Sequence, residues 1–170
     1  MAKVEFGKLD VLITDDLINE CLNKHYIIIY GHAKSGKILI ARLLSEKLKR
    51  KLILTDDFMD YGFKESIYVI REKIKEINEP LIIEGVQTAR LLRKGIEMND
   101  FFADLIIHLE CDEQSIEQSY INDGEINKIP QIHKFNQTID KIFEEYKYLQ
   151  EINYPQKKPQ IITLNTSYNG

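Results

Sequence analysis

A short segment rich in glycine and lysine is the part of this sequence best suited to chemistry. Gly31-His32-Ala33-Lys34-Ser35-Gly36-Lys37 follows the apolar run Tyr26–Tyr30 and opens a stretch with helical spacing of Ile40, Ala41, Leu44 and Leu48. A strand, a glycine loop and a helix in this order hold the phosphates of a nucleotide, because backbone N–H groups and the helix dipole face the anion. We predict that this loop binds phosphate and that Lys37 reaches the β- and γ-phosphates.

The residue after Lys37 departs from the usual pattern. A serine or threonine normally stands there, and its hydroxyl helps to hold Mg²⁺, whereas this chain has Ile38. We include Ile38 in the predicted nucleotide-binding loop. Its side chain offers no metal ligand, so carboxylates elsewhere would have to carry more of the metal binding.

Acidic residues follow two further apolar runs. Thr55-Asp56-Asp57-Phe58 ends the run Lys51–Thr55, and Glu84 closes Leu81–Glu84. A carboxylate at the end of a strand beside a phosphate loop can deprotonate an acceptor hydroxyl or hold Mg²⁺. We predict Asp56 as the base with Asp57 in support, and Glu84 and Asp56 as Mg²⁺ ligands. Without the phosphate loop, the same acids would equally suit a helix cap or a solvated loop.

Other residues carry weaker signals. Arg90 and Arg93 lie three residues apart on the predicted helix Gln87–Lys94, where they would grip an anionic substrate or cover an exposed helix face. Tyr61 and Phe63 would stack on a planar acceptor or simply pack. His108 lies within an apolar run and is interpreted as a satisfied core residue.

The elements that must position these residues alternate between apolar strands and helices. Helices are predicted from Thr14-Asp15-Asp16, from the loop to about Lys49, over Ile67–Ile77 and Gln87–Lys94, after Asp112, and over Gln131–Leu149. Five runs read as strands, namely Tyr26–Tyr30, Lys51–Thr55, Leu81–Glu84, Leu105–Leu109 and Gln160–Leu164. Near-continuous apolar strands alternating with helices predict an α/β fold with a parallel sheet covered on both faces. Ligands bind at the carboxyl ends of such strands, where the candidate residues gather.

Composition fits an ordinary soluble chain of 170 residues, most simply one domain. The net charge of −4 gives no general attraction to nucleic acids or anionic membranes, so neither is expected as a partner. No run is as long as a transmembrane helix, and Met1–Phe6 lacks the apolar core of a signal peptide. Cys21 and Cys111 read as two buried free thiols of a reducing compartment, which predicts a cytoplasmic protein.

From Tyr26 to Leu164, the chain resembles the uridine kinase and nicotinamide riboside kinase branch of P-loop kinases. The loop ending in Lys37 is similar to that family's ATP-phosphate loop. Asp56-Asp57-Phe58 is similar to its Asp-x-Phe motif, whose first acid is the catalytic base, and Leu81–Val86 to its strand ending in Glu-Gly, whose acid helps to hold Mg²⁺.

The resemblance implies a three-layer α/β/α sandwich with a five-stranded parallel sheet. It also implies ATP and Mg²⁺ as cofactors, and transfer of the γ-phosphoryl group to a hydroxyl of a small molecule, often a nucleoside. The domain would span residues 26–170 with a short lid around 119–134, and residues 1–25 would form an extension packed on it. The apolar stripe of Gln131–Leu149 is expected against the sheet, or against a second subunit of a homodimer.

Two departures from that family leave alternatives open. Ile38 is one; the other is the lid, where the family carries arginines that close over the phosphates. Here no arginine follows Arg93, and Ser119–Lys134 offers only Lys128, His133 and Lys134. Arg90, Arg93, Lys34 or Lys128 would have to substitute. The alternatives to a kinase are a catalytically weak or inactive protein that binds nucleotide to regulate or scaffold, and a structural protein that retains only the fold.

Overall fold

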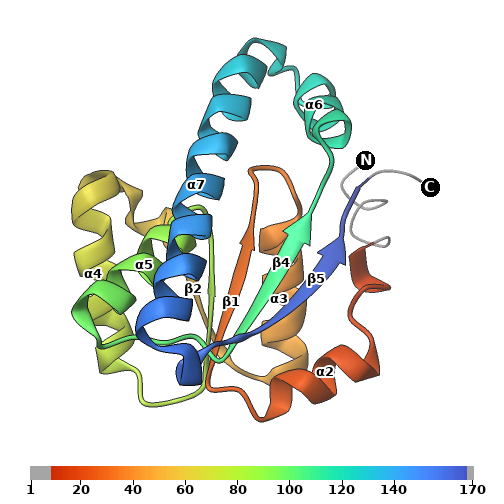
Figure 1. Ribbon diagram of the computed structural model, residues 1–170. Helices are drawn as coiled ribbons and strands as arrows, with labels where there is room; N and C mark the ends of the chain where they lie inside the picture. Colours follow the sequence, from red (N-terminus) through yellow and green to blue (C-terminus); the bar gives the residue numbers. More distant parts are fainter. Residues whose placement is uncertain (1–8, 168–170) are drawn as a thin grey trace.

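A five-stranded parallel sheet forms the middle layer of the protein (Figure 1). The structure is a computed structural model that describes residues 9–167. The first eight residues of the predicted extension 1–25 and the last three residues of the chain therefore lie outside the described residues. The strands lie side by side in the order β2-β3-β1-β4-β5. Their bounds are Tyr26–Gly31 for β1, Lys51–Leu54 for β2, Leu81–Glu84 for β3, Leu105–Glu110 for β4 and Gln160–Asn165 for β5.

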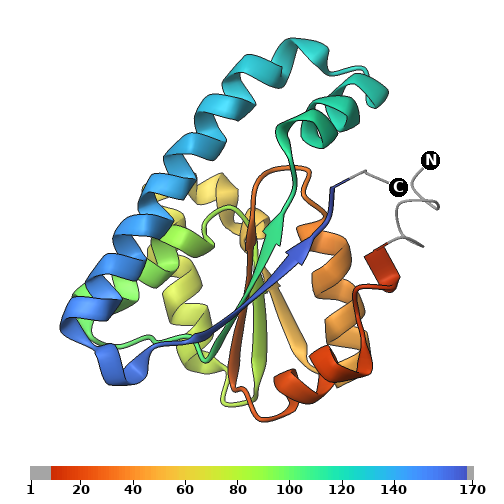
Figure 2. The ribbon, with the colours of Figure 1, turned by 45° about the vertical axis from the view of Figure 1, so that its right-hand side comes forward.

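Helices cover both faces of this sheet, which confirms the predicted three layers (Figure 2). Helices α2 and α3 lie on one face, and α4, α5 and α7 lie on the other. Their bounds are Asp15–Leu22 for α2, Lys37–Leu48 for α3, Gly62–Glu76 for α4, Thr88–Met98 for α5, Glu113–Asn122 for α6 and Ile129–Asn153 for α7. The part of the chain that the structure describes also contains three short 3₁₀ helices, namely η1 (Thr55–Tyr61), η2 (Ile126–Lys128) and η3 (Pro155–Lys157).

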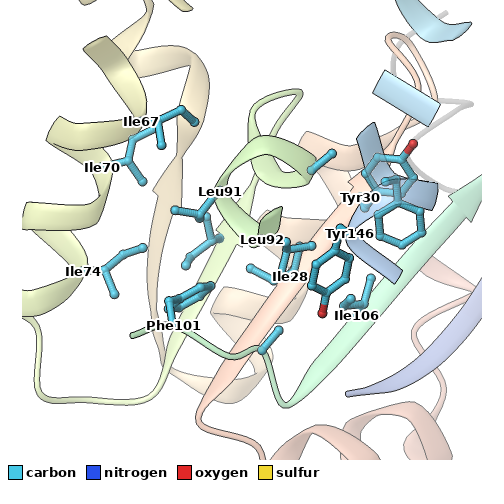
Figure 3. Close-up of a cluster of buried hydrophobic side chains, with 14 of the residues drawn as sticks. Ile28, Tyr30, Ile67, Ile70, Ile74, Leu91, Leu92, Phe101, Ile106 and Tyr146 are labelled. Atoms are coloured by element: carbon cyan, nitrogen blue, oxygen red, sulfur yellow. The ribbon is translucent and has the colours of Figure 1, made fainter. Parts of the chain in front are cut away.

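Alternation of side chains along β1 divides the core into two clusters. Ile28 and Tyr30 face α4, α5 and α7, and Figure 3 shows this cluster. Ile27 and Ile29 face α2 and α3. Because both faces are buried, the central strands carry almost no polar side chain until their carboxyl ends. The polar side chains of the central strands are thereby concentrated at the carboxyl ends of these strands.

The predicted helices and strands are all present, and several of their bounds differ; α7, for example, runs over Ile129–Asn153 rather than Gln131–Leu149. Thr14 and Asp112 cap α2 and α6 as expected, each accepting a hydrogen bond from a backbone N–H. Strand β2 ends one residue early, because Thr55 begins η1, and Ile77 is the C-cap of α4 rather than part of its helix. Helix α5 continues to Met98 through Gly95, where a Cβ would stand 2.4 Å from the Phe101 carbonyl oxygen. Only glycine allows that close approach.

Helix α7 packs its apolar stripe against the sheet, which agrees with the favoured prediction. Ile139, Phe143 and Tyr146 are buried, and α7 contacts α5. The N-terminal part of α7 continues beyond the sheet and, with α6 and η2, forms an arm above the carboxyl ends of the strands (Figures 1 and 2). We call residues 113–140 the arm. No helix within residues 9–167 is long and apolar enough to cross a membrane.

Part of the N-terminal extension belongs to the core. Leu17 and Cys21 of α2 are buried with Ile40 and Leu44 of α3, and burial raises the pKa of the Cys21 thiol to about 11. Cys111 differs from the prediction, since it is only half-buried at the end of β4. Both cysteines are free.

Replacing Leu17 by alanine tests how firmly α2 is attached. Leu17 is 5% exposed, so its truncation should lower the free energy of unfolding by about 2–4 kcal/mol through lost burial and an unfilled cavity. Leu22 on the same helix is 57% exposed and serves as the control, with a change below about 0.5 kcal/mol. Urea unfolding measures both. Equal effects of the two substitutions would contradict the packing of α2.

Candidate functional site

The predicted phosphate loop connects β1 to α3. Gly31 ends the strand, and Gly36 is the N-cap of α3 with a φ of +92°, a conformation that glycine adopts without strain. Lys37 is the first residue of the helix and is only 6% exposed. Its Nζ donates a hydrogen bond to the His32 carbonyl oxygen at 2.6 Å. The Lys37 side chain thus folds back so that its ammonium group contacts the backbone of the loop.

The arm holds three consecutive residues of this loop. His32 Nε2 lies 2.7 Å from Asp140 Oδ2, and the Ala33 N–H donates to Asn136 Oδ1 at 3.2 Å. The Lys34 ammonium pairs with Asp123, and Glu125 Oε1 lies 3.7 Å away. These contacts join the loop to both α6 and α7, so the position of the arm and the shape of the loop are coupled.

Asp140 makes a second contact besides the one to His32. Its other oxygen accepts a hydrogen bond of 2.5 Å from the Tyr30 hydroxyl. Burial alone would raise the pKa of Asp140, but the hydrogen bonds from His32 and Tyr30 hold it below its ordinary value. Burial and the bond to Asp140 raise the pKa of the Tyr30 hydroxyl, so it remains a donor.

His32 and His108 line a separate cavity of about 760 Å³ between β4 and α7. The prediction of a core role for His108 is wrong in part, because this side chain is half-buried at the cavity, where its ring is tilted against the stacked rings of Tyr30 and Phe143. Burial lowers the pKa of His108, which favours the neutral ring. The His32 side chain points toward Asp140, and only its backbone carbonyl contacts Lys37.

A second cavity, of about 620 Å³, brings the main candidate residues together. Lys37 from α3, Asp56 from η1 and Glu84 from β3 all line it. The loop contributes Ala33–Ile38, and the remaining walls come from Leu39, Val86, Ser119, Tyr120, Asn122, Asp123, Asn165–Ser167, Leu9 and Leu12. Gly31, His32, Asp57 and Arg90 do not line it. We call this space the loop cavity.

Two of the charged groups in the loop cavity, Lys37 and Glu84, are strongly desolvated. Glu84 is 3% exposed, and burial raises its pKa to about 7, although the Lys37 charge opposes this rise. Burial lowers the pKa of Lys37, opposed by Glu84 and Asp56. Within residues 9–167, Lys37 and Glu84 form no ion pair with each other or with any other side chain, so neither charge is directly neutralised.

The loop residues fit the phosphates of a nucleotide. Ser35 is 2% exposed, and its Oγ is the single buried side-chain polar atom without a partner among the described residues. A buried hydroxyl without a partner costs free energy unless a ligand satisfies it. The buried ammonium of Lys37 and the free N–H groups at the start of α3 also require an anion.

The acids fit a magnesium ion that is bound mostly by phosphate and water. Within residues 9–167, no three His, Cys, Asp or Glu side chains come close enough to hold a metal by themselves. Mg²⁺ usually takes only one or two carboxylates beside substrate phosphates, and Asp56 and Glu84 supply that number. Ile38, 38% exposed, lines the same cavity and presents apolar surface there.

Three of the side chains considered as substitutes for the lid arginines contact groups outside the loop cavity. Arg93 pairs with Glu145 and Glu97, and Lys128 pairs with Glu125. Arg90 donates to Gln87 Oε1 at 3.0 Å and lies 5.3 Å from the centre of the Phe63 ring. Lys34 and Lys37 are therefore the cationic side chains that line the loop cavity within the described part of the chain.

Sequence reasoning did not single out Asn136 and Asp140, although a signal was present. Both lie on the same face of α7 as Ile139 and Phe143, where a polar residue interrupts the apolar stripe. A polar side chain on a core-facing stripe needs a partner, and here the partner is the phosphate loop. Leu9, Leu12 and Asn165 gave no such signal, because their place at the cavity depends on the fold.

Comparisons with known proteins agree with this geometry at the level of the fold. No protein-family model matches the chain, and no curated protein sequence matches it significantly. Among solved structures, the chain is similar to a shikimate kinase from Acinetobacter baumannii with 14% identity, a TM-score of 0.53 and coverage of 83% of this chain and 99% of the other. It is also similar to a gluconokinase from Sinorhizobium meliloti with 14% identity, a TM-score of 0.52 and coverage of 83% and 82%. A deoxyadenosine kinase from M. mycoides shares 13% identity with a TM-score of 0.50 and coverage of 83% and 91%.

These likenesses establish the class of fold. The parallel sheet, the loop after β1 and the flanking helices form the fold of the P-loop nucleoside triphosphate hydrolases. The Asp56 and Glu84 carboxylates and the Lys37 ammonium lie at the carboxyl ends of the strands, where this fold places ligands.

Replacing Glu84 by glutamine tests the desolvation of the site. The ordinary pKa of a glutamate side chain is 4.5, whereas the pKa of Glu84 in the folded chain is about 7. Between these two pH values, the folded chain keeps a proton on Glu84 that the unfolded chain releases. The contribution of Glu84 to stability is therefore full at low pH and is lost as the pH rises to about 7. Without nucleotide or metal, the free energy of unfolding of the wild type relative to Glu84→Gln should fall by about 2–3 kcal/mol between about pH 5 and about pH 8.

Urea unfolding across this pH range measures the effect. Glu46→Gln, at an exposed position on α3, is the control and should follow the wild type at every pH. Parallel pH profiles for the wild type and Glu84→Gln would show that Glu84 is solvated instead.

Proposed function

We propose that this protein is a small-molecule kinase that transfers the γ-phosphoryl group of ATP to a hydroxyl of a nucleoside-like acceptor. The observation that carries the proposal is the convergence of Lys37, Asp56 and Glu84 on one cavity beside the phosphate loop. The fold neighbours with which the chain shares this architecture are named as kinases of small molecules, which supports the same reaction class.

Each residue has a distinct task in this proposal. Backbone N–H groups of the loop and the Ser35 hydroxyl bind the phosphate chain, and Lys37 neutralises charge that develops on the transferring group. Asp56 is solvent-exposed and accepts the proton of the acceptor hydroxyl. Glu84 and Asp56 would hold Mg²⁺, which supplies further charge stabilisation when bound. Asp57, outside the cavity, acts through its charge on Glu84.

A group of planar side chains on α4, α5 and α7, none of which lines the loop cavity, suits a nucleoside-like acceptor. Phe63 at the start of α4 is 49% exposed, and its ring centre lies 6.3 Å from that of Phe135 on α7. Arg90 of α5 lies over the same Phe63 ring. Three helices thus present aromatic and guanidinium faces, on which a nucleobase stacks favourably.

A nucleotide-binding regulator without turnover is the second candidate, and the arm favours it. Its turn carries Asp123 and Glu125, which pair with Lys34 and Lys128. A P-loop kinase gains on the order of 10³-fold or more in rate from an arginine that stabilises the transferring phosphoryl group. Acidic residues in the place of that arginine, together with Ile38, suit nucleotide binding better than phosphoryl transfer.

Turnover of Mg·ATP separates the two candidates. The kinase proposal predicts ADP release that depends on one member of a panel of nucleosides, nucleoside monophosphates and small alcohols. Lys37→Ala should lower this rate by about 10²-fold or more, and Asp56→Asn by about 10²–10⁴-fold, without unfolding the chain. Lys47→Ala and Asp60→Asn, at exposed positions on α3 and η1, are matched controls.

Different outcomes point to different proteins. Full activity in Asp56→Asn would remove Asp56 as the base while leaving the kinase proposal intact. ATP binding by calorimetry without turnover on any acceptor would favour the regulator. Failure to bind ATP or GTP at millimolar concentration would favour a structural protein that retains only the fold.

Replacing Ile38 by threonine tests the placement of Mg²⁺. The new hydroxyl would stand where phosphate loops of this kind carry a metal ligand, so the Mg²⁺ concentration for half-maximal ATP affinity should fall by about tenfold. Ile38→Val keeps the apolar, branched shape and is the control. Calorimetric titration of ATP at several Mg²⁺ concentrations measures the shift, and equal behaviour of both variants would place the metal away from residue 38.

A further inference from the structure

Two leucines from outside the central domain line the loop cavity. Leu9 and Leu12 precede α2, yet both contribute to the walls of this cavity. Leu9 reaches the phosphate loop itself, because a Cβ on Gly36 would stand 2.8 Å from Leu9 Cδ1. The leucine side chain therefore covers the glycine that begins α3. Both leucines are only partly buried, which leaves apolar surface facing the cavity.

The segment that carries these leucines is anchored. Backbone hydrogen bonds of 3.0 Å from the Leu12 N–H to the Leu9 carbonyl, and of 3.1 Å from Ile13 to Asp10, form a turn. Ile13, 6% exposed, and Leu17 then fasten the segment to the core cluster on the α3 side. Val11, between the two leucines, points outward and is 73% exposed. Leu9 and Leu12 are thus held at the cavity by the fold.

The loop cavity has two chemically different ends. The sheet order β2-β3-β1-β4-β5 puts Asp56 and Glu84, which follow β2 and end β3, on one side of the phosphate loop. Asn165–Ser167, which end and follow β5, lie on the other side. The acids are where phosphoryl transfer would occur, so the rest of the nucleotide extends toward β5. Leu9, Leu12 and Leu39 line the cavity. The N-terminal segment lies beside β5, whose Ile162 and Leu164 pack against the same core cluster as Leu9 and Leu12 (Figure 1).

We propose that Leu9 and Leu12 form an apolar wall against which the sugar and base of a nucleoside triphosphate pack. This inference rests on the proposed nucleotide site but not on catalysis. The phosphate loop recognises the triphosphate, and the N-terminal segment recognises the nucleoside. The base supplies a flat apolar face for the leucine side chains, and the polar groups of Asn165–Ser167 face its edge.

Comparing ATP with inorganic tripolyphosphate isolates the nucleoside half. With the full chain and Mg²⁺, calorimetry should show that Leu9→Ala and Leu12→Ala each weaken ATP binding by about five- to tenfold through lost apolar contact. Both variants should bind tripolyphosphate within about twofold of the wild type. Val11→Ala is the matched control and should leave both affinities unchanged, whereas Lys37→Ala should weaken both.

Each outcome decides the inference. Weaker ATP binding with unchanged tripolyphosphate binding supports the wall. Unchanged ATP binding overturns it, as does equal loss of both ligands, which would mean that the leucines only support the loop. Tighter ATP binding in Leu9→Ala or Leu12→Ala would show that the segment obstructs the cavity. A wild type that binds neither ligand would overturn the nucleotide site itself, whereas binding without turnover would overturn only the kinase proposal.

Discussion

The rest of this site depends on the burial of the Lys37 ammonium group at the N-terminus of α3. The positive end of the helix dipole and the lysine charge have the same sign, and both lie in a desolvated place. Glu84 offsets this charge without forming an ion pair, and burial keeps its own pKa raised. A desolvated positive charge that no ion pair neutralises favours the binding of an anion. A triphosphate neutralises this charge with several oxygens at once, and the unpartnered Ser35 hydroxyl adds a further donor.

Holding these like charges together requires a rigid loop, and the arm provides the rigidity. Asp140, Asn136 and Asp123 each contact a different one of three consecutive loop residues, and Tyr30 of β1 donates a hydrogen bond to Asp140. The arm therefore supports the ligand site through acceptors rather than through cations. Movement of α6 and α7 would alter the loop directly, so the arm couples the conformation of α6 and α7 to the shape of the loop.

The sequence was sufficient for the sheet, because the central strands β1, β3 and β4 are apolar runs that are buried on both faces, and the edge strands β2 and β5 are partly exposed runs that each follow a helix. It also located Lys37, Asp56 and Glu84, since parallel strands bring their carboxyl ends to one edge. It was insufficient where a side chain's role depends on a long-range partner. His108 has an apolar sequence neighbourhood but stands at a cavity, and His32 meets Asp140 across 108 positions of the chain. Arg90 lies three residues before Arg93, yet one contacts Phe63 and the other Glu145.

The unusual features of the chain are connected through the loop cavity. A phosphate loop with a hydroxyl at position 38 and an arginine-bearing lid can bind a nucleotide mainly by its charged groups. In this protein, Ile38 contributes only apolar surface, and the turn of the arm contributes acids. Under the proposed function, the free energy of nucleotide binding would come from elsewhere, and the fold offers two sources. One is the desolvated charge of Lys37, which is worth more in a water-poor cavity than at a surface. The other is apolar contact, for which Leu9 and Leu12 are already held in place by a segment anchored to the core.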